Sequence, residues 1–289
     1  MKRILFTIIL TALFGNLTGQ NTVKPDTTEY DNRRQTSKVN LRLQYSSDWV
    51  YAGRKDSLVA PYLTPSILYA HHSGFFVKGF LSYLTNENRI DVWGVGAGYR
   101  MNKKNIYWGI GGELRLFNDS SYAIQSAVTS VAYTYLGYDL PWLETTVDIN
   151  GFFGDVGDVL VGLELGKTFY LNDNKLSLYP FVYGLWGTQQ YYGEYFTYKS
   201  TSQRKKQGQG GVNPPSIITY TTVEESTKFK FLSIDLGLSI RYRLNNMNIY
   251  FMPSYAIPFN PSTFKNDNTI SQENLKNTFY YNVGISFLL

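Results

Sequence analysis

Few side chains in this 289-residue chain are of the types that usually carry catalysis. There is no cysteine, and the only histidines are His71 and His72. Because the two are consecutive at the end of an extended segment, we expect them to point to opposite faces, which would prevent them from chelating one metal ion together. The motifs G-x-S-x-G, H-E-x-x-H and G-x-x-x-x-G-K-[ST] are absent. The sequence therefore predicts no catalytic residue, no metal site and no cofactor, and we expect that the protein is not an enzyme.

Charged side chains of both signs form a second candidate set, because they recur on the polar side of alternating segments. Such charges inside a closed wall could line a pore and set its ion selectivity, or could pair and seal a small lumen. The candidate lumen-lining residues are Arg42, Asp48, Lys78, Arg100, Glu113, Arg115, Asp148, Glu164, Asp235 and Arg241.

The elements that would position these charges are segments in which apolar and polar residues alternate. The last one shows the pattern clearly: Phe279, Tyr281, Val283, Ile285, Phe287 and Leu289 fall on one side of an extended strand, and Tyr280, Asn282, Gly284 and Ser286 on the other. About twelve such segments occur, and this strand length and number are typical of membrane barrels. They lie near 39–51, 58–71, 75–84, 89–101, 105–117, 121–135, 144–153, 158–171, 175–192, 228–244, 247–257 and 278–289.

We therefore predict an all-β, transmembrane, antiparallel up-and-down β-barrel of about 12 strands, with about 10–14 as the range. The connections support this fold, because short ones and long ones alternate along the chain. Five connections fall on the side that would carry both termini; four of them are tight, 72–74, 102–104, 172–174 and 245–246, and the fifth lies near 136–143. The two longest connections, 192–227 and 258–277, fall on the other side. A secreted β-sandwich is the alternative, but its strands would be shorter, about 5–6 residues.

The N-terminus predicts export. Lys2 and Arg3 precede an apolar run over 4–14, which is the pattern of a signal peptide, here 1–19. An uncleaved N-terminal anchor is the alternative. Residues 20–37 are polar and aperiodic and read as a flexible periplasmic lead-in, and 38–289 is the predicted barrel. The expected location is the outer membrane of a Gram-negative cell.

Composition limits the kinds of binding partner that we expect. Lys and Arg total 27 against 22 acidic residues, and no basic stripe lies on a regular element, so nucleic-acid binding is not expected. The 25 tyrosines suit the aromatic girdles of a membrane barrel. The loop residues Arg204, Lys205 and Lys206 could contact lipopolysaccharide phosphates. The expected partners are membrane lipid, lipopolysaccharide, the barrel-assembly machinery and small polar solutes, and the expected state is a monomer.

Glycines gather on the polar side of two neighbouring segments. Gly94, Gly96 and Gly98 share one face, and Gly109 and Gly111 share the inner face of the next segment. No helix follows, which argues against a dinucleotide-binding loop. Inner-face glycines leave room for large side chains, and we name Phe76, Tyr179 and Phe181 as candidates to fill it.

Two stretches resemble known outer-membrane proteins. Tyr281, Phe287 and Leu289 resemble the C-terminal assembly signal of such proteins, although that signal usually ends in Phe. The stretch 45–54 (YSSDWVYAGR) resembles the first strand of small porins that carry an S-S-D-aromatic-V-x-x-G motif. With its tyrosine-rich body, the chain resembles outer-membrane β-barrels of the Bacteroidota type. The resemblance implies a barrel fold and no catalytic residues.

The function that follows is a narrow porin-like channel for passive passage of small polar solutes. One alternative is a closed barrel with a structural or surface ligand-binding role, because a lumen of about twelve strands lies between filled and open sizes. A lipid-modifying outer-membrane enzyme is a further alternative.

Overall fold

The computed structural model describes residues 36–55, 59–118, 121, 128–154, 157–190, 222–224, 226–266 and 269–289. The predicted signal peptide, nearly all of the lead-in and the basic loop at 204–206 lie outside the described residues.

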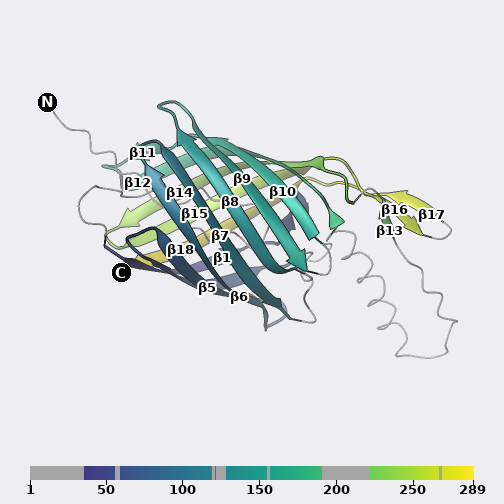
Figure 1. Cartoon of the computed structure of the whole chain (residues 1–289), viewed down its shortest axis with the longest axis horizontal. Helices are drawn as coiled ribbons and strands as arrows, with labels where there is room; N and C mark the ends of the chain where they lie inside the picture. The colour runs from purple at the N-terminus through teal and green to yellow at the C-terminus, as the bar shows by residue number, and fades with distance from the viewer. Residues whose placement is uncertain are drawn as a thin grey trace.

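Twelve antiparallel strands form one closed barrel (Figure 1). Each strand pairs with its neighbour along the chain, β10 pairs with β12, and the last strand pairs with the first, so the sheet has no free edge. The strands are β1 (Lys38–Ser46), β4 (Tyr62–Ala70), β5 (Phe75–Leu84), β6 (Arg89–Lys103), β7 (Ile106–Phe117), β8 (Val128–Asp139), β9 (Glu144–Gly154), β10 (Gly157–Gly166), β12 (Leu176–Gly187), β14 (Lys230–Leu244), β15 (Met247–Pro258) and β18 (Thr278–Leu288). The predicted fold class and strand number are confirmed.

Several strand boundaries differ from the prediction. The first strand ends at Ser46 instead of residue 51, and the sixth spans Val128–Asp139 instead of 121–135. The predicted strand 158–171 is interrupted after Gly166, and its remainder, β11 (Phe169–Leu171), pairs with β12 alone. Trp49, Val50 and Tyr51 are apolar and suit the end of a membrane strand, so the sequence did not mark the point where the backbone turns away.

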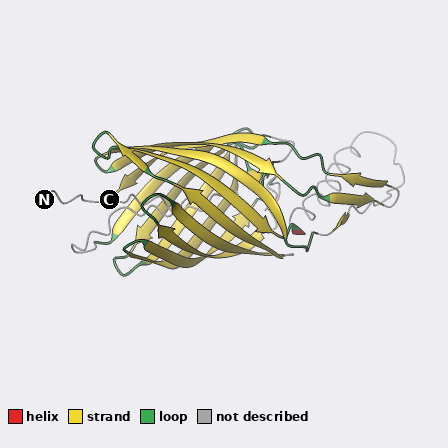
Figure 2. Cartoon of the chain, turned by 90° about the horizontal axis from the view of Figure 1, so that it is seen from above, coloured by secondary structure: helices red, strands yellow, loops and turns green. Residues whose placement is uncertain are grey.

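The two ends of the barrel differ in their connections. The start of β1 and the end of β18 lie at one end, called here the inner end, together with tight turns such as that at Asn245 (Figures 1 and 2). Asn172, Asp173 and Asn174 adopt positive φ there, a conformation that Asn and Asp tolerate better than most residues. At the outer end the chain forms a separate three-stranded sheet of β13 (Thr222–Glu224), β16 (Thr263–Asn266) and β17 (Thr269–Gln272). Within the described residues, both long predicted loops therefore lie on the predicted side.

The wall has an apolar outer face and a polar inner face. On β7, Ile110, Leu114 and Leu116 are exposed on the outside, whereas Glu113 and Arg115 point inward and are buried. Among the described residues, no helix is long and apolar enough to cross a membrane.

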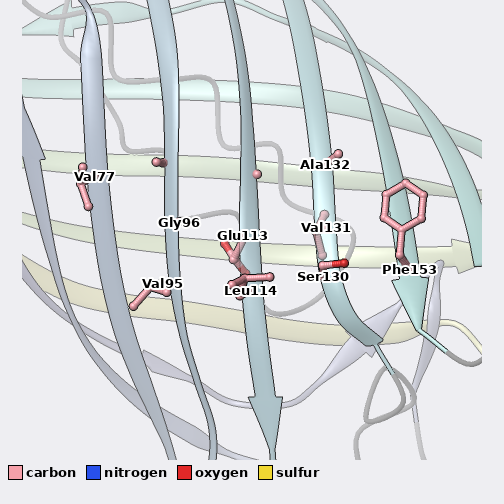
Figure 3. A pocket seen from close by; sticks show the side chains of 11 residues that line it. Val77, Val95, Gly96, Glu113, Leu114, Ser130, Val131, Ala132 and Phe153 are labelled. Atoms are coloured by element: carbon pink, nitrogen blue, oxygen red, sulfur yellow. The ribbon is translucent and has the colours of Figure 1, made fainter.

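A shallow groove of about 520 Å³ crosses the outer face of β5 to β9 (Figure 3). Its floor is built from small residues in register, with Ala97 opposite Gly112 and Gly112 opposite Ala132. Val77, Leu114 and Phe153 stand around this floor.

Inner-face glycines lie under large side chains of the neighbouring strand. A Cβ on Gly98 would lie 2.5 Å from the ring of Phe76, and one on Gly111 would lie 2.5 Å from the Tyr133 hydroxyl. The prediction that Phe76 uses this space is confirmed. Tyr179 and Phe181 instead lie over other glycines, Gly166 and Gly237, because both glycines pair with Phe181 and Tyr179 lies two residues away on the same face of β12.

Candidate functional site

The candidate site is the inner face of the barrel, where the structure places the ten charged residues named from the sequence. Nine of them belong to barrel strands and point inward, and Asp48 lies in the connection that follows β1. All are buried except Arg100, which is partly exposed. The nine strand residues share an inward position, while the role of the set in lining a pore stays a prediction.

Three of these residues form one ion-pair network on β5 and β7. Lys78 Nζ lies 2.5 Å from Glu113 Oε2, and Arg115 Nε donates to Glu113 Oε1. Gly96 on the intervening strand makes the contact possible, because a Cβ there would lie 2.8 Å from Lys78 Cε. The single carboxylate of Glu113 therefore faces two cations, and the network carries one net positive charge.

Tyrosines bind two further inner carboxylates, Glu164 and Asp148. The Tyr179 hydroxyl donates to Glu164 Oε1 over 2.8 Å, and the Tyr183 hydroxyl lies 3.3 Å from each oxygen of Asp148. On the opposite wall, Arg42 Nε donates to the Tyr250 hydroxyl over 2.7 Å. The phenol groups thus connect strands across the inner face at several levels, an arrangement that gave no signal in the sequence beyond the tyrosine count.

The connection between β1 and β4 folds into the outer end of the barrel. It contains a two-stranded element, β2 (Val50–Tyr51) and β3 (Arg54–Lys55), which we call the entrance hairpin. Val50, Tyr51 and Ala52 are 0–1% exposed, values found only where neighbouring groups enclose a side chain on all sides. The prediction of one continuous strand over 39–51 is wrong here, because the chain folds inward after Ser46.

Contacts from several strands fix the entrance hairpin. Tyr51 and Ala52 belong to one apolar cluster with Phe152 of β9, Leu160 of β10 and Leu232 of β14. Gly53 has a φ of +77°, and a Cβ there would lie 2.7 Å from Ser233 Cβ, so glycine permits both the turn and the close approach to β14.

Polar groups complete the attachment of the hairpin. Arg54 Nε donates to both carboxylate oxygens of Glu273, over 3.0 and 3.1 Å, and Arg54 NH2 donates to the Phe259 and Asn260 carbonyls. Asp48 accepts hydrogen bonds from the backbone N–H groups of Trp49 and Ala60. Because Arg54 and Glu273 come from two different outer connections, the ion pair joins the hairpin to the loop before β18.

The two histidines lie at the inner end, and their relative orientation differs from the prediction. Their ring centroids are 4.0 Å apart, so the side chains lie side by side instead of on opposite faces. The reason is that β4 ends at Ala70, and the alternation of a strand no longer applies to His71 and His72. Among the described residues, no group of three or more metal-ligating side chains occurs.

These observations define the class of the protein: a closed, twelve-stranded antiparallel barrel with an apolar outside and a charged, tyrosine-rich inside. No protein-family model and no curated protein matches the sequence. Solved structures that it is similar to include the KdgM porin (9% identity, 86% of this chain and 98% of that chain covered, TM-score 0.46) and the NanC porin (12%, 86% and 98%, 0.45). Another is the translocator domain of the autotransporter NalP from Neisseria meningitidis (12%, 89% and 90%, 0.39). These identities and TM-scores are too low to carry an argument, so the fold is established by the strand pairing of this chain.

Proposed function

We propose that this protein resides in the outer membrane and acts as a narrow porin-like channel for passive passage of small polar solutes. The observation that carries the proposal is the pairing of a closed barrel with opposite chemistry on its two faces. A closed sheet satisfies its backbone hydrogen bonds in lipid, and its outer face must then be apolar.

The outer face supports the membrane location. Exposed tyrosines stand near both ends of the strands: Tyr69 and Tyr138 at the inner end, and Tyr255 at the outer end. Such residues prefer the two membrane–water interfaces. We further propose that the protein works as a monomer, inserted by the barrel-assembly machinery into a membrane that contains lipopolysaccharide.

The inner face supports passage of polar solutes. Arg42, Lys78, Arg100, Asp148 and Glu164 present both charge signs along the interior, as selectivity-determining walls do. The entrance hairpin then narrows the lumen at the outer end, because Tyr51 and Ala52 pack against inner side chains of β9, β10 and β14.

Planar-bilayer recordings test the proposal. We expect small single-channel steps from the wild-type protein and larger steps from a variant in which residues 49–55 are replaced by Gly-Ser-Gly, since the hairpin no longer narrows the lumen. A matched control carries Glu87→Gly in the exposed outer turn between β5 and β6, and should conduct like the wild type.

Burial of the entrance hairpin favours a second candidate, the closed barrel with a structural or ligand-binding role. A closed barrel would show no single-channel steps in the wild-type protein, even though a heat-modifiability gel shows that the protein is fully folded. Conductance that appears only in the hairpin variant would assign the closed state to the wild type and overturn passive passage as its function.

A further inference from the structure

Asp235 is the inner carboxylate with the least compensation. Its side chain is fully buried, with 0% exposure. Oδ2 lies 3.3 Å from the Tyr280 hydroxyl, and Oδ1 has no hydrogen-bond partner. In the part of the chain that the structure describes, no Lys or Arg forms an ion pair with it.

A second buried oxygen without a partner lies on the neighbouring strand β15. Ser254 is 2% exposed, and its Oγ makes no hydrogen bond. In the strand register, Ser254 lies opposite Gly237 on β14 and opposite Tyr280 on β18. Gly237 comes two residues after Asp235, so the two share the inner face of β14. Asp235, Ser254 and Tyr280 therefore offer three oxygen atoms on one patch of the inner face.

The entrance hairpin lies next to this patch. Val50 packs with Ala256 and Tyr280, and Ala256 is the residue directly opposite Asp235. On its other side, Asp235 faces Tyr183, which belongs to the apolar cluster around Tyr51 and Ala52. The carboxylate is thus shut off from bulk water, which cannot compensate its charge.

A buried ionised carboxylate is costly unless a positive charge neutralises it. We propose that Asp235 Oδ1, Ser254 Oγ and the Tyr280 hydroxyl bind one monovalent alkali cation of the size of Na⁺ or K⁺ beneath the entrance hairpin. Oxygen ligands select a hard cation, and a single carboxylate balances one positive charge. A divalent ion would require more carboxylates than the patch supplies. The proposal rests on the proposed channel only for the route by which the cation enters.

Anomalous diffraction tests binding without any need for conduction. Crystals of the detergent-solubilised full chain grown in thallium(I) or rubidium salts should show an anomalous peak at metal–oxygen coordination distance from Asp235 Oδ1. The peak should vanish in Asp235→Asn and remain in Asp148→Asn, a matched control, because Asp148 already accepts bonds from Tyr183 and Asn150. Absence of the peak in the wild type would overturn the proposal.

Thermal unfolding supplies the second readout. At equal ionic strength, KCl should raise the Tm of the wild type above its value in N-methylglucamine chloride by about 3 °C, and should leave that of Asp235→Asn unchanged. Equal Tm values in both salts would mean that Asp235 is a neutral acid. A cation peak without measurable conductance would retain the site and reject the channel, so the two proposals fail separately.

Discussion

Glu113 and Asp235 are both buried carboxylates on the inner face, yet their surroundings differ. Glu113 lies on β7 between Lys78 and Arg115, and both cations contact it. Asp235 lies on β14, far around the barrel, with one tyrosine hydroxyl for a partner. The comparison shows two ways of keeping an acid inside the same wall: one charge is compensated within the chain, and the other leaves room for a partner from outside.

The largest expected effect comes from breaking the compensated site. Glu113→Ala leaves Lys78 and Arg115 buried without their shared anion, and we expect the free energy of unfolding to fall by about 3–5 kcal/mol. Urea unfolding in lipid vesicles, followed by tryptophan fluorescence, measures this loss. Glu87→Ala, in an exposed outer turn, is the matched control and should change little; a small effect of Glu113→Ala would show that the network contributes little to stability.

The next largest effect tests whether the ion-pair network of Lys78, Glu113 and Arg115 requires glycine at position 96. In Gly96→Ala the new Cβ would lie 2.7 Å from the Gly112 carbonyl oxygen and 2.8 Å from Lys78 Cε, so we expect a loss of about 1–3 kcal/mol. The control Gly112→Ala adds the same methyl group on the opposite face of the next strand, where the nearest atom is 3.5 Å away. Equal stability of the two variants by urea titration would contradict this account.

A smaller effect of opposite sign is expected at the uncompensated site. In N-methylglucamine chloride, Asp235→Asn removes a buried charge that has no cation, and the free energy of unfolding should rise by about 1 kcal/mol. The same titration in both salts measures it. A loss as large as that of Glu113→Ala would remove the contrast between the two carboxylates.

The smallest effect is expected at Asp48, a third carboxylate with an exposed cation. Lys55 Nζ lies 3.3 Å from Asp48 Oδ2, and its side chain is 41% exposed. We expect a coupling energy below about 1 kcal/mol in a double-mutant cycle of Lys55→Ala and Asp48→Asn. A coupling of several kcal/mol would mean that exposure does not weaken the pair as expected.

The sequence predicted the barrel well because each strand has one face in contact with apolar surroundings and one face toward the interior. A period of two therefore marks both the strand and the direction of its side chains. Arg42, Glu113 and Arg241 point inward as their parity requires. The positions of the two long loops followed from counting strands.

The site was predicted only in outline, because its key contacts join residues far apart in the chain. Arg54 meets Glu273, and Tyr280 meets Asp235, through strand closure and tilt that no local pattern encodes. The entrance hairpin had one available signal, the apolar run around Val50 next to Gly53, but the same residues also suited the end of a membrane strand. Which charges are neutralised and which are not could be seen only after the wall was assembled.

The seam between β1 and β18 has a consequence for how the protein is made. Residues 40–46 pair with residues 282–288. The barrel therefore cannot close until β18, which is synthesised after all the other barrel strands, is available to pair with β1. Until synthesis is complete, two unpaired edges remain open to any other extended chain. Closure of the barrel must therefore follow the synthesis of β18, and a chain truncated before Thr278 should be a target for aggregation or proteolysis.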